Sequence, residues 1–148
     1  MSDTEVFKFD HKEAIRQIER AISKLKPPKS VLLVDDDEAD IILNTRLLKK
    51  FKVELAGCNV GQDAITRLRE KEYDLVLFDL VMPPMDGLKL MMDAAGLQRG
   101  THFILVTGFP SSPNVDAVLR LGAVMLPKPL TEHSLELIGL EKIELSPP

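Results

Sequence analysis

Five short apolar runs, each followed by an amphipathic stretch, constrain the fold of this chain more than any other feature of its sequence. The runs occupy residues 31–34, 53–58, 75–78, 103–106 and 124–126. Strands that are apolar along their whole length are typical of a parallel sheet with helices on both faces, because neither face is left to water. The alternation therefore predicts an α/β fold with a doubly wound, five-stranded parallel sheet. The accompanying helices are expected over residues 38–50, 62–71, 88–95, 115–121 and 132–139.

A further helix is predicted over residues 11–25, before the first strand. Asp10 and Glu13 form a capping-box-like pair at its start, and Pro27-Pro28 ends it. We therefore divide the chain into an amino-terminal amphipathic helix with a proline-rich linker, residues 1–28, and one α/β domain, residues 29–148.

This amino-terminal helix has two chemically different faces. One face is apolar and the other is basic: the apolar face carries Ile15, Ile18, Ala21, Ile22 and Leu25, and the basic face carries Lys12, Arg16, Arg20 and Lys24. A helix of this length is marginal alone in water, so its apolar face must pack on something. We expect it to pack on the α/β domain or on a second copy of the chain, as in a homodimer, with an acidic partner or a membrane surface as the alternative.

The overall charge and the cysteine count exclude several classes of function. A formal charge of −4 gives no attraction for phosphodiester backbones, so nucleic acid is not expected as a partner. The sequence has no apolar run of membrane-spanning length and no signal-peptide pattern, which predicts a cytoplasmic protein. Cys58 is the only cysteine and the three histidines are scattered, so neither a disulfide framework nor a Cys/His metal site is expected. Cys58 is predicted to be a small buried residue.

Polar side chains follow four of the predicted strands, at the point where each strand ends. Asp35-Asp36-Asp37 follows the first strand, Asp79 the third, Thr107-Gly108 the fourth and Lys128 the fifth. In an open α/β sheet, ligands bind outside the carboxyl ends of the strands, so these side chains are expected to converge. Each motif alone has an ordinary structural explanation, such as a solvated turn or a helix cap. Their conjunction is what indicates a site.

Clustered carboxylates imply a cation. Two carboxylates about 4 Å apart repel by roughly 4 kcal/mol at an effective dielectric of 20, so three of them need a positive charge among them. Mg²⁺ is the natural candidate, because it is a hard ion that takes few carboxylates and commonly bridges protein oxygens to a phosphoryl group. The Lys128 ammonium and the Thr107 hydroxyl could each bind a phosphoryl oxygen.

Together these motifs resemble the receiver domain of two-component response regulators. The resemblance covers residues 30 to about 139. It rests on the acidic pair Asp35-Asp36, the string Asp79-x-x-Met82-Pro83-x-Met85-Asp86-Gly87, Thr107 before Gly108, and Lys128-Pro129.

The resemblance implies a flavodoxin-like sheet with strand order 2-1-3-4-5. It also implies that Asp79 accepts a phosphoryl group from a histidine kinase or a phosphotransfer protein. The implied magnesium ligands are Asp36, Asp79 and the Val81 carbonyl, with Asp35 acting through water. Thr107 and Lys128 would bind the acyl phosphate and shift a two-state equilibrium that signals by protein–protein interaction.

Two departures from the family pattern concern the output step. Met125 stands three positions before the lysine, where receivers usually have an aromatic switch residue, and the segment from Gly122 to Lys128 is one residue short. Few residues follow Pro129 and the closing helix needs most of them, so we expect a stand-alone receiver without an output domain. Such a module is not an enzyme, since it turns over nothing beyond its own phosphoryl group.

The acidic run is also compatible with two alternative functions. Asp35-x-Asp37 after an apolar strand resembles the nucleophile pattern of haloacid-dehalogenase-type phosphatases, in which Asp35 would be phosphorylated. Against it, Ala39 stands where a Thr or Val is expected, a late acidic pair for magnesium is missing, and the string from Asp79 to Gly87 would go unexplained. The other alternative is a receiver-like scaffold that is never phosphorylated, which the complete set of acids, threonine and lysine makes the weaker hypothesis.

Overall fold

The computed structural model describes residues 11–23, 27–59, 61–80, 86–94, 96–97 and 100–144. Five strands form one sheet: β1 (Ser30–Val34), β2 (Glu54–Cys58), β3 (Leu75–Phe78), β4 (His102–Thr107) and β5 (Val124–Pro127). The helices are α1 (His11–Ser23), α2 (Glu38–Leu48), α3 (Gly61–Glu70), α4 (Gly87–Ala94), α5 (Pro113–Arg120) and α6 (Glu132–Leu137). All four strand pairings are parallel and the strand order is β2-β1-β3-β4-β5, which confirms the predicted fold class and strand order.

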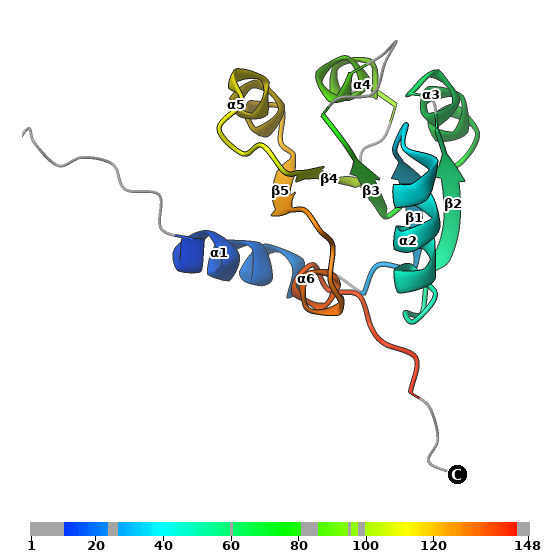
Figure 1. Cartoon of the computed structure of the whole chain (residues 1–148), viewed down its shortest axis with the longest axis vertical. Helices are drawn as coiled ribbons and strands as arrows, with labels where there is room; N and C mark the ends of the chain where they lie inside the picture. The colour runs from blue at the N-terminus through cyan, green and yellow to red at the C-terminus, as the bar shows by residue number, and fades with distance from the viewer. Residues whose placement is uncertain are drawn as a thin grey trace, which may run out of the picture.

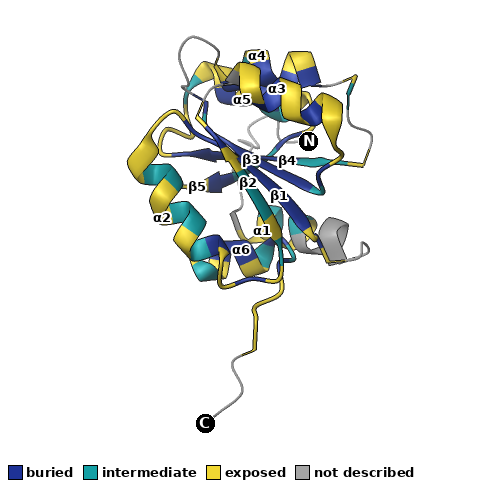
Figure 2. Cartoon of the chain, turned by 90° about the vertical axis from the view of Figure 1, so that its right-hand side faces the viewer, coloured by how far each residue is buried: buried dark blue, intermediate teal, exposed yellow. Residues whose placement is uncertain are grey.

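Helices cover both faces of the sheet. Figure 1 and Figure 2 show α3, α4 and α5 on one face, and α2, α6 and α1 on the other. Strand β1 is apolar throughout because both of its faces are covered. Leu32 and Val34 belong to the core cluster on the side of α3, α4 and α5, and Val31 and Leu33 belong to the cluster on the side of α2 and α6. Every residue of β1 is therefore buried, as are all four residues of β3. Cys58 is buried at the end of β2, as predicted.

Helix α1 packs on the face of the sheet that α6 covers. Figure 1 shows it beside α6, and Ile18 is half-buried against the core cluster beneath them. Ile15 is more exposed, at 38%. The expected contributions of Asp10 and Leu25, and of the Ile22 side chain, lie outside what the structure describes. Ile18 therefore shows α1 packing on the α/β domain of its own chain.

The chain beyond α6 returns to the loop after α2, an arrangement that the sequence did not indicate. Leu140 is buried in the same core cluster as α6. The Lys52 N–H donates to the Glu141 carbonyl at 2.8 Å, and the Ile143 N–H donates to the Lys50 carbonyl at 2.8 Å. This segment therefore adds Leu140 to the core cluster on the face of the sheet that α2 and α6 cover.

Among the residues placed by the structure, no helix is both long enough and apolar enough to cross a membrane.

Candidate functional site

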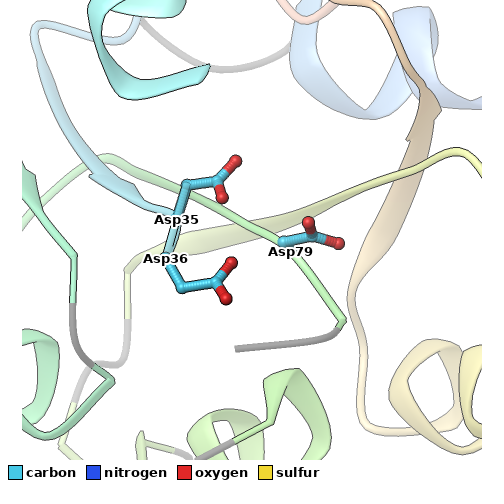
Figure 3. Close-up of side chains that lie close together, drawn as sticks. All are labelled: Asp35, Asp36 and Asp79. Atoms are coloured by element: carbon cyan, nitrogen blue, oxygen red, sulfur yellow. The ribbon is translucent and has the colours of Figure 1, made fainter. Parts of the chain in front are cut away.

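The loops that follow β1, β3, β4 and β5 meet at the carboxyl-terminal edge of the sheet. Asp35 and Asp36 follow β1 and Asp79 follows β3. Each of these residues offers one carboxylate oxygen, and the three oxygens lie within 4.8 Å of one another (Figure 3). Thr107 ends β4 and Lys128 directly follows β5. The strand order brings β1, β3, β4 and β5 side by side, which is why residues far apart in sequence converge here.

Asp35 is the buried member of the carboxylate group, with 4% of its surface exposed. Its Oδ1 accepts a hydrogen bond from the Asp37 N–H at 3.0 Å. Burial raises the pKa of Asp35 from 3.8 to about 6, and that hydrogen bond and the Lys128 charge only partly offset the increase. A nearby cation would favour the ionised form of Asp35.

Asp36 and Asp37 are both exposed but differ in what their side chains do. Asp37 is the N-cap of α2, and its Oδ1 accepts hydrogen bonds from the N–H groups of Ala39 at 2.9 Å and Asp40 at 3.4 Å. The Asp36 carboxylate lies instead with Asp35 and Asp79. The capping role explains why the third acid of the run is not part of the carboxylate group.

Asp79 is partly exposed, with 16% of its side chain open to solvent. Its Oδ1 accepts a hydrogen bond from the Leu80 N–H at 2.7 Å, and its Oδ2 accepts one from Lys128 Nζ at 2.6 Å. These two contacts fix the carboxylate plane relative to the strand ends. The Val81 carbonyl, the remaining implied metal ligand, lies outside the described residues.

Lys128 is the cation of the site. Its Nζ lies 2.6 Å from Asp79 Oδ2, 3.5 Å from Asp40 Oδ2 and 3.9 Å from Asp35 Oδ2. Burial lowers the pKa of the Lys128 ammonium, but the hydrogen bond to Asp79 and the charges of Asp79, Asp35 and Asp40 outweigh burial and leave it above its usual value. Lys128 is therefore positively charged at every pH at which the protein would function.

Thr107 is buried and links two loops of the site. Its Oγ1 accepts a hydrogen bond from the Phe109 N–H at 3.0 Å, and its backbone carbonyl accepts one from the Lys128 N–H at 3.0 Å. Its hydroxyl hydrogen remains able to donate to a ligand. Thr107, Phe109, Asp79 and Lys128 line one cavity of about 470 Å³.

Asp86 and Gly87 shape the chain between the site and α4. The Asp86 Oδ1 accepts a hydrogen bond from the Lys89 N–H at 2.8 Å, in the first turn of that helix. The Gly87 N–H donates to the Leu80 carbonyl at 2.7 Å. These residues of the motif therefore have local structural roles and do not belong to the carboxylate group.

The donor set fits a hard divalent cation. Asp35, Asp36 and Asp79 supply three carboxylates, whereas Lys128 supplies one positive charge, so ionised side chains leave an excess of negative charge. Oxygen donors of this kind suit Mg²⁺ and offer nothing to a metal that prefers sulfur or imidazole.

The family model for the response regulator receiver domain matches residues 31–138. The chain belongs to this family. Receivers are modules of two-component systems that are phosphorylated on an aspartate by kinases or phosphotransfer partners, and they bind Mg²⁺ at the acidic site.

Individual relatives agree with this assignment. The transcriptional regulatory protein ZraR of Salmonella typhimurium strain LT2 is 34% identical over 101 residues, which are 68% of this chain and 23% of ZraR. The crystal structure of a CheY-like receiver from Methanospirillum hungatei JF-1 has a TM-score of 0.68 and 29% identity, covering 73% of this chain and 87% of that one. The Ssk1 receiver of Saccharomyces cerevisiae, solved with the phosphotransfer protein Ypd1, shares the fold at a TM-score of 0.63 and 22% identity; the match covers 76% of this chain and 86% of that one.

This receiver spans about a quarter of the length of curated relatives such as ZraR. Those relatives carry further sequence outside the matched part, so the stand-alone character of the present chain stays a prediction.

The structure brings together all the predicted site side chains that it describes: Asp35, Asp36, Asp79, Thr107 and Lys128.

Sequence reasoning missed Asp40 as a neighbour of Lys128. No signal in the sequence indicates this pairing, because an acid in the first turn of a helix is explained equally well by the helix dipole. Met125, at the usual aromatic position, is half-buried against the core under α3, α4 and α5.

Proposed function

We propose that this receiver accepts a phosphoryl group on Asp79 from a histidine kinase or a phosphotransfer protein and signals by protein–protein interaction. The observation that carries the proposal is the 2.6 Å contact between Lys128 Nζ and Asp79 Oδ2, made beside the carboxylates of Asp35 and Asp36. A partly exposed carboxylate, a fixed ammonium and clustered acids are the parts that phosphoryl transfer to an aspartate needs.

The chain's own residues have separate roles in this transfer. An oxygen of Asp79 attacks the phosphorus of a phosphohistidine, a P–O bond forms, the P–N bond breaks and the imidazole leaves. Lys128 and the Thr107 hydroxyl bind oxygens of the transferred group, and charge-assisted hydrogen bonds of this kind contribute about 1.5 to 3 kcal/mol. Asp36 and Asp79 would hold Mg²⁺ directly and Asp35 through water, and the ion would neutralise charge on the phosphoryl oxygens.

Binding the acyl phosphate would also couple the site to the loops around it. Thr107 and Lys128 belong to different loops that share a backbone hydrogen bond, so drawing both side chains toward one phosphoryl group moves the loops together. The proposed output is a shift between two conformations of these loops, which a partner protein recognises. In this proposal the receiver turns over no substrate apart from its own phosphoryl group.

The structure disfavours Asp35 as a phosphatase nucleophile. The side chain of Asp35 is 5% exposed and accepts a hydrogen bond from the Asp37 N–H, whereas the side chain of Asp79 is 16% exposed and lines the cavity. A nucleophile must be open to in-line approach of the donor, and Asp79 meets this requirement better.

Labelling with a small phosphodonor tests the proposal. The protein is incubated with phosphoramidate and MgCl₂, and the modified residue is mapped by mass spectrometry after borohydride trapping. We expect modification at Asp79, none in Asp79→Asn, and wild-type modification in Asp93→Asn, a matched change at an exposed aspartate on α4. Modification at Asp35 would support the phosphatase alternative, and no modification of the wild type would support the scaffold.

A further inference from the structure

Lys128 has a carboxylate neighbour that takes no part in the proposed metal site. Asp40 Oδ2 lies 3.5 Å from Lys128 Nζ, on the α2 side of the ammonium. Asp79 Oδ2 lies 2.6 Å from the same nitrogen. The ammonium is thus shared between the phosphoacceptor and a residue of α2.

Asp40 is held in place by the way α2 begins. Glu38 is the first residue of the helix, so Asp40 falls in its first turn, where Asp37 caps the backbone N–H groups of Ala39 and Asp40. The positive end of the helix dipole favours an ionised carboxylate at this position. The side chain of Asp40 is 38% exposed, so solvent weakens its attraction for Lys128 without removing it.

Phosphorylation would change one of the two carboxylates that attract Lys128, Asp79, and leave the other, Asp40, unchanged. On the Asp79 side, the carboxylate oxygen becomes part of an acyl phosphate and the ammonium has to move to a phosphoryl oxygen. On the other side, Asp40 keeps its charge and its place on α2. The attraction of Asp40 therefore opposes the movement of Lys128 toward the phosphoryl group.

We propose that Asp40 is a positioning residue that holds the Lys128 ammonium on the α2 side of the site and thereby disfavours the phosphorylated form of this receiver. The inference rests on the proposed function, because it presumes that Lys128 binds the phosphoryl group on Asp79. Asp40 does not touch the reacting atoms and acts only through Lys128.

Binding of beryllium trifluoride, a non-covalent stand-in for the phosphoryl group, measures this effect at saturating MgCl₂. We expect Asp40→Asn to bind the probe more tightly by roughly two- to fivefold, the size expected when one half-exposed ion pair is removed. Glu38→Gln is the matched control. It removes the same charge from the same turn of α2, and Glu38 is exposed and makes no ion pair with the other residues that the structure places. The control should change the affinity much less.

A double-mutant cycle shows whether Asp40 acts through Lys128. In a Lys128→Met background the probe binds more weakly, and adding Asp40→Asn should then have no further effect. The same cycle measured by urea unfolding in EDTA should show coupling between Asp40 and Lys128 in the metal-free protein. An Asp40→Asn effect that matches Glu38→Gln, that persists without Lys128, or that weakens probe binding would overturn the inference.

Phosphoramidate labelling separates this inference from the proposed function. If the wild-type protein does not label at Asp79, the proposed function fails and the inference fails with it. If the wild-type protein labels at Asp79 but Asp40→Asn binds beryllium trifluoride like wild type, only the inference fails.

Discussion

Gly87 packs so closely against Asp79 that a Cβ atom at Gly87 would come within 2.5 Å of the Asp79 carbonyl oxygen. The same Cβ would lie 3.0 Å from Leu80 Cα and 3.1 Å from Phe78 Cδ2. Two of these three neighbours are backbone atoms, which cannot swing aside as a flexible side chain can. The start of α4 therefore fixes the position of the backbone that carries Asp79.

Replacing Gly87 with Ala is expected to displace Asp79. The added methyl group should lower the free energy of unfolding by roughly 1 to 3 kcal/mol, as overpacking typically does, and slow phosphoramidate labelling of Asp79. Gly96→Ala is the matched control, because a Cβ at Gly96 meets nothing within 4 Å. Urea unfolding and labelling rates that do not differ between the two variants would contradict the close packing.

The two exposed acids after β1 should differ in their effect on metal binding. Asp36→Ala is expected to lose most of the Mg²⁺ affinity, because it removes a carboxylate of the group that includes Asp35 and Asp79. Asp37→Ala should lose little affinity but about 1 kcal/mol of stability, since it removes the N-cap of α2. Isothermal titration with MgCl₂ and thermal melts measure the two quantities. Equal losses of Mg²⁺ affinity in the two variants would show that the assignment of Asp36, and not Asp37, to the metal site is wrong.

Asp35 should make the stability of the metal-free receiver depend on pH. Its pKa is raised from 3.8 to about 6 in the folded state, so the folded protein holds this proton more tightly than the unfolded chain. The resulting stabilisation is complete below pH 4 and is lost as the pH rises through 6, by up to about 3 kcal/mol. Asp35→Asn should abolish that part of the slope in urea unfolding with EDTA. An identical pH profile in the variant would mean that Asp35 is not the group responsible.

The sheet and its carboxyl-terminal edge could be predicted because their signals are local. The central strands β1 and β3 are apolar runs that are buried along their whole length, so hydrophobic burial and sequence pattern agree there, whereas β2 contains Glu54 and is largely exposed or half-buried. The positions of Asp79 and Lys128 followed, because parallel strands end at one edge. The 2.6 Å contact between these two side chains is the structural consequence.

The parts that escaped prediction depend on contacts between distant segments. The return of residues 140–144 to the loop after α2 rests on backbone hydrogen bonds, such as the one from Lys52 to Glu141, that leave no pattern in the sequence. The pairing of Asp40 with Lys128 likewise depends on where α2 starts relative to β5. An acid in the first turn of a helix is explained equally well by the helix dipole, so sequence alone gives it no partner.

Removing residues 1–28 should expose apolar surface on the receiver. Ile18 of α1 packs against the core cluster under α6, so its loss leaves part of that cluster open to water. The truncated protein is expected to melt at a lower temperature or to change its association state, as measured by calorimetry and by light scattering on a sizing column. Ile18→Asp should reproduce part of this effect, whereas Gln17→Asp, on an exposed neighbour in the same helix, should not. Unchanged melting and mass after truncation would mean that α1 contributes nothing to the receiver core.

Phe109 bears on how long the phosphorylated state persists. It follows Thr107 by two residues, is 75% exposed, and lines the cavity that contains Asp79 and Lys128. By the resemblance to receivers, the residues two positions after Asp79 and two positions after Thr107, here Val81 and Phe109, are expected to flank the path of the attacking water; Val81 lies outside the described residues. Neither side chain can hydrogen-bond that water, and positioning of the nucleophile is a large share of phosphoryl-transfer catalysis.

Slow loss of the phosphoryl group is therefore expected. Combining Val81→Asn with Phe109→Glu should supply polar groups that position the water and shorten the phosphorylated lifetime; each tenfold change corresponds to about 1.4 kcal/mol of barrier. Phe109→Leu keeps the position apolar and should decay at the wild-type rate. The measurement is the decay of phosphorylated protein after removal of phosphoramidate, followed on a Phos-tag gel. Decay at one common rate in wild type, Phe109→Leu and the double variant would show that these two positions do not set the lifetime.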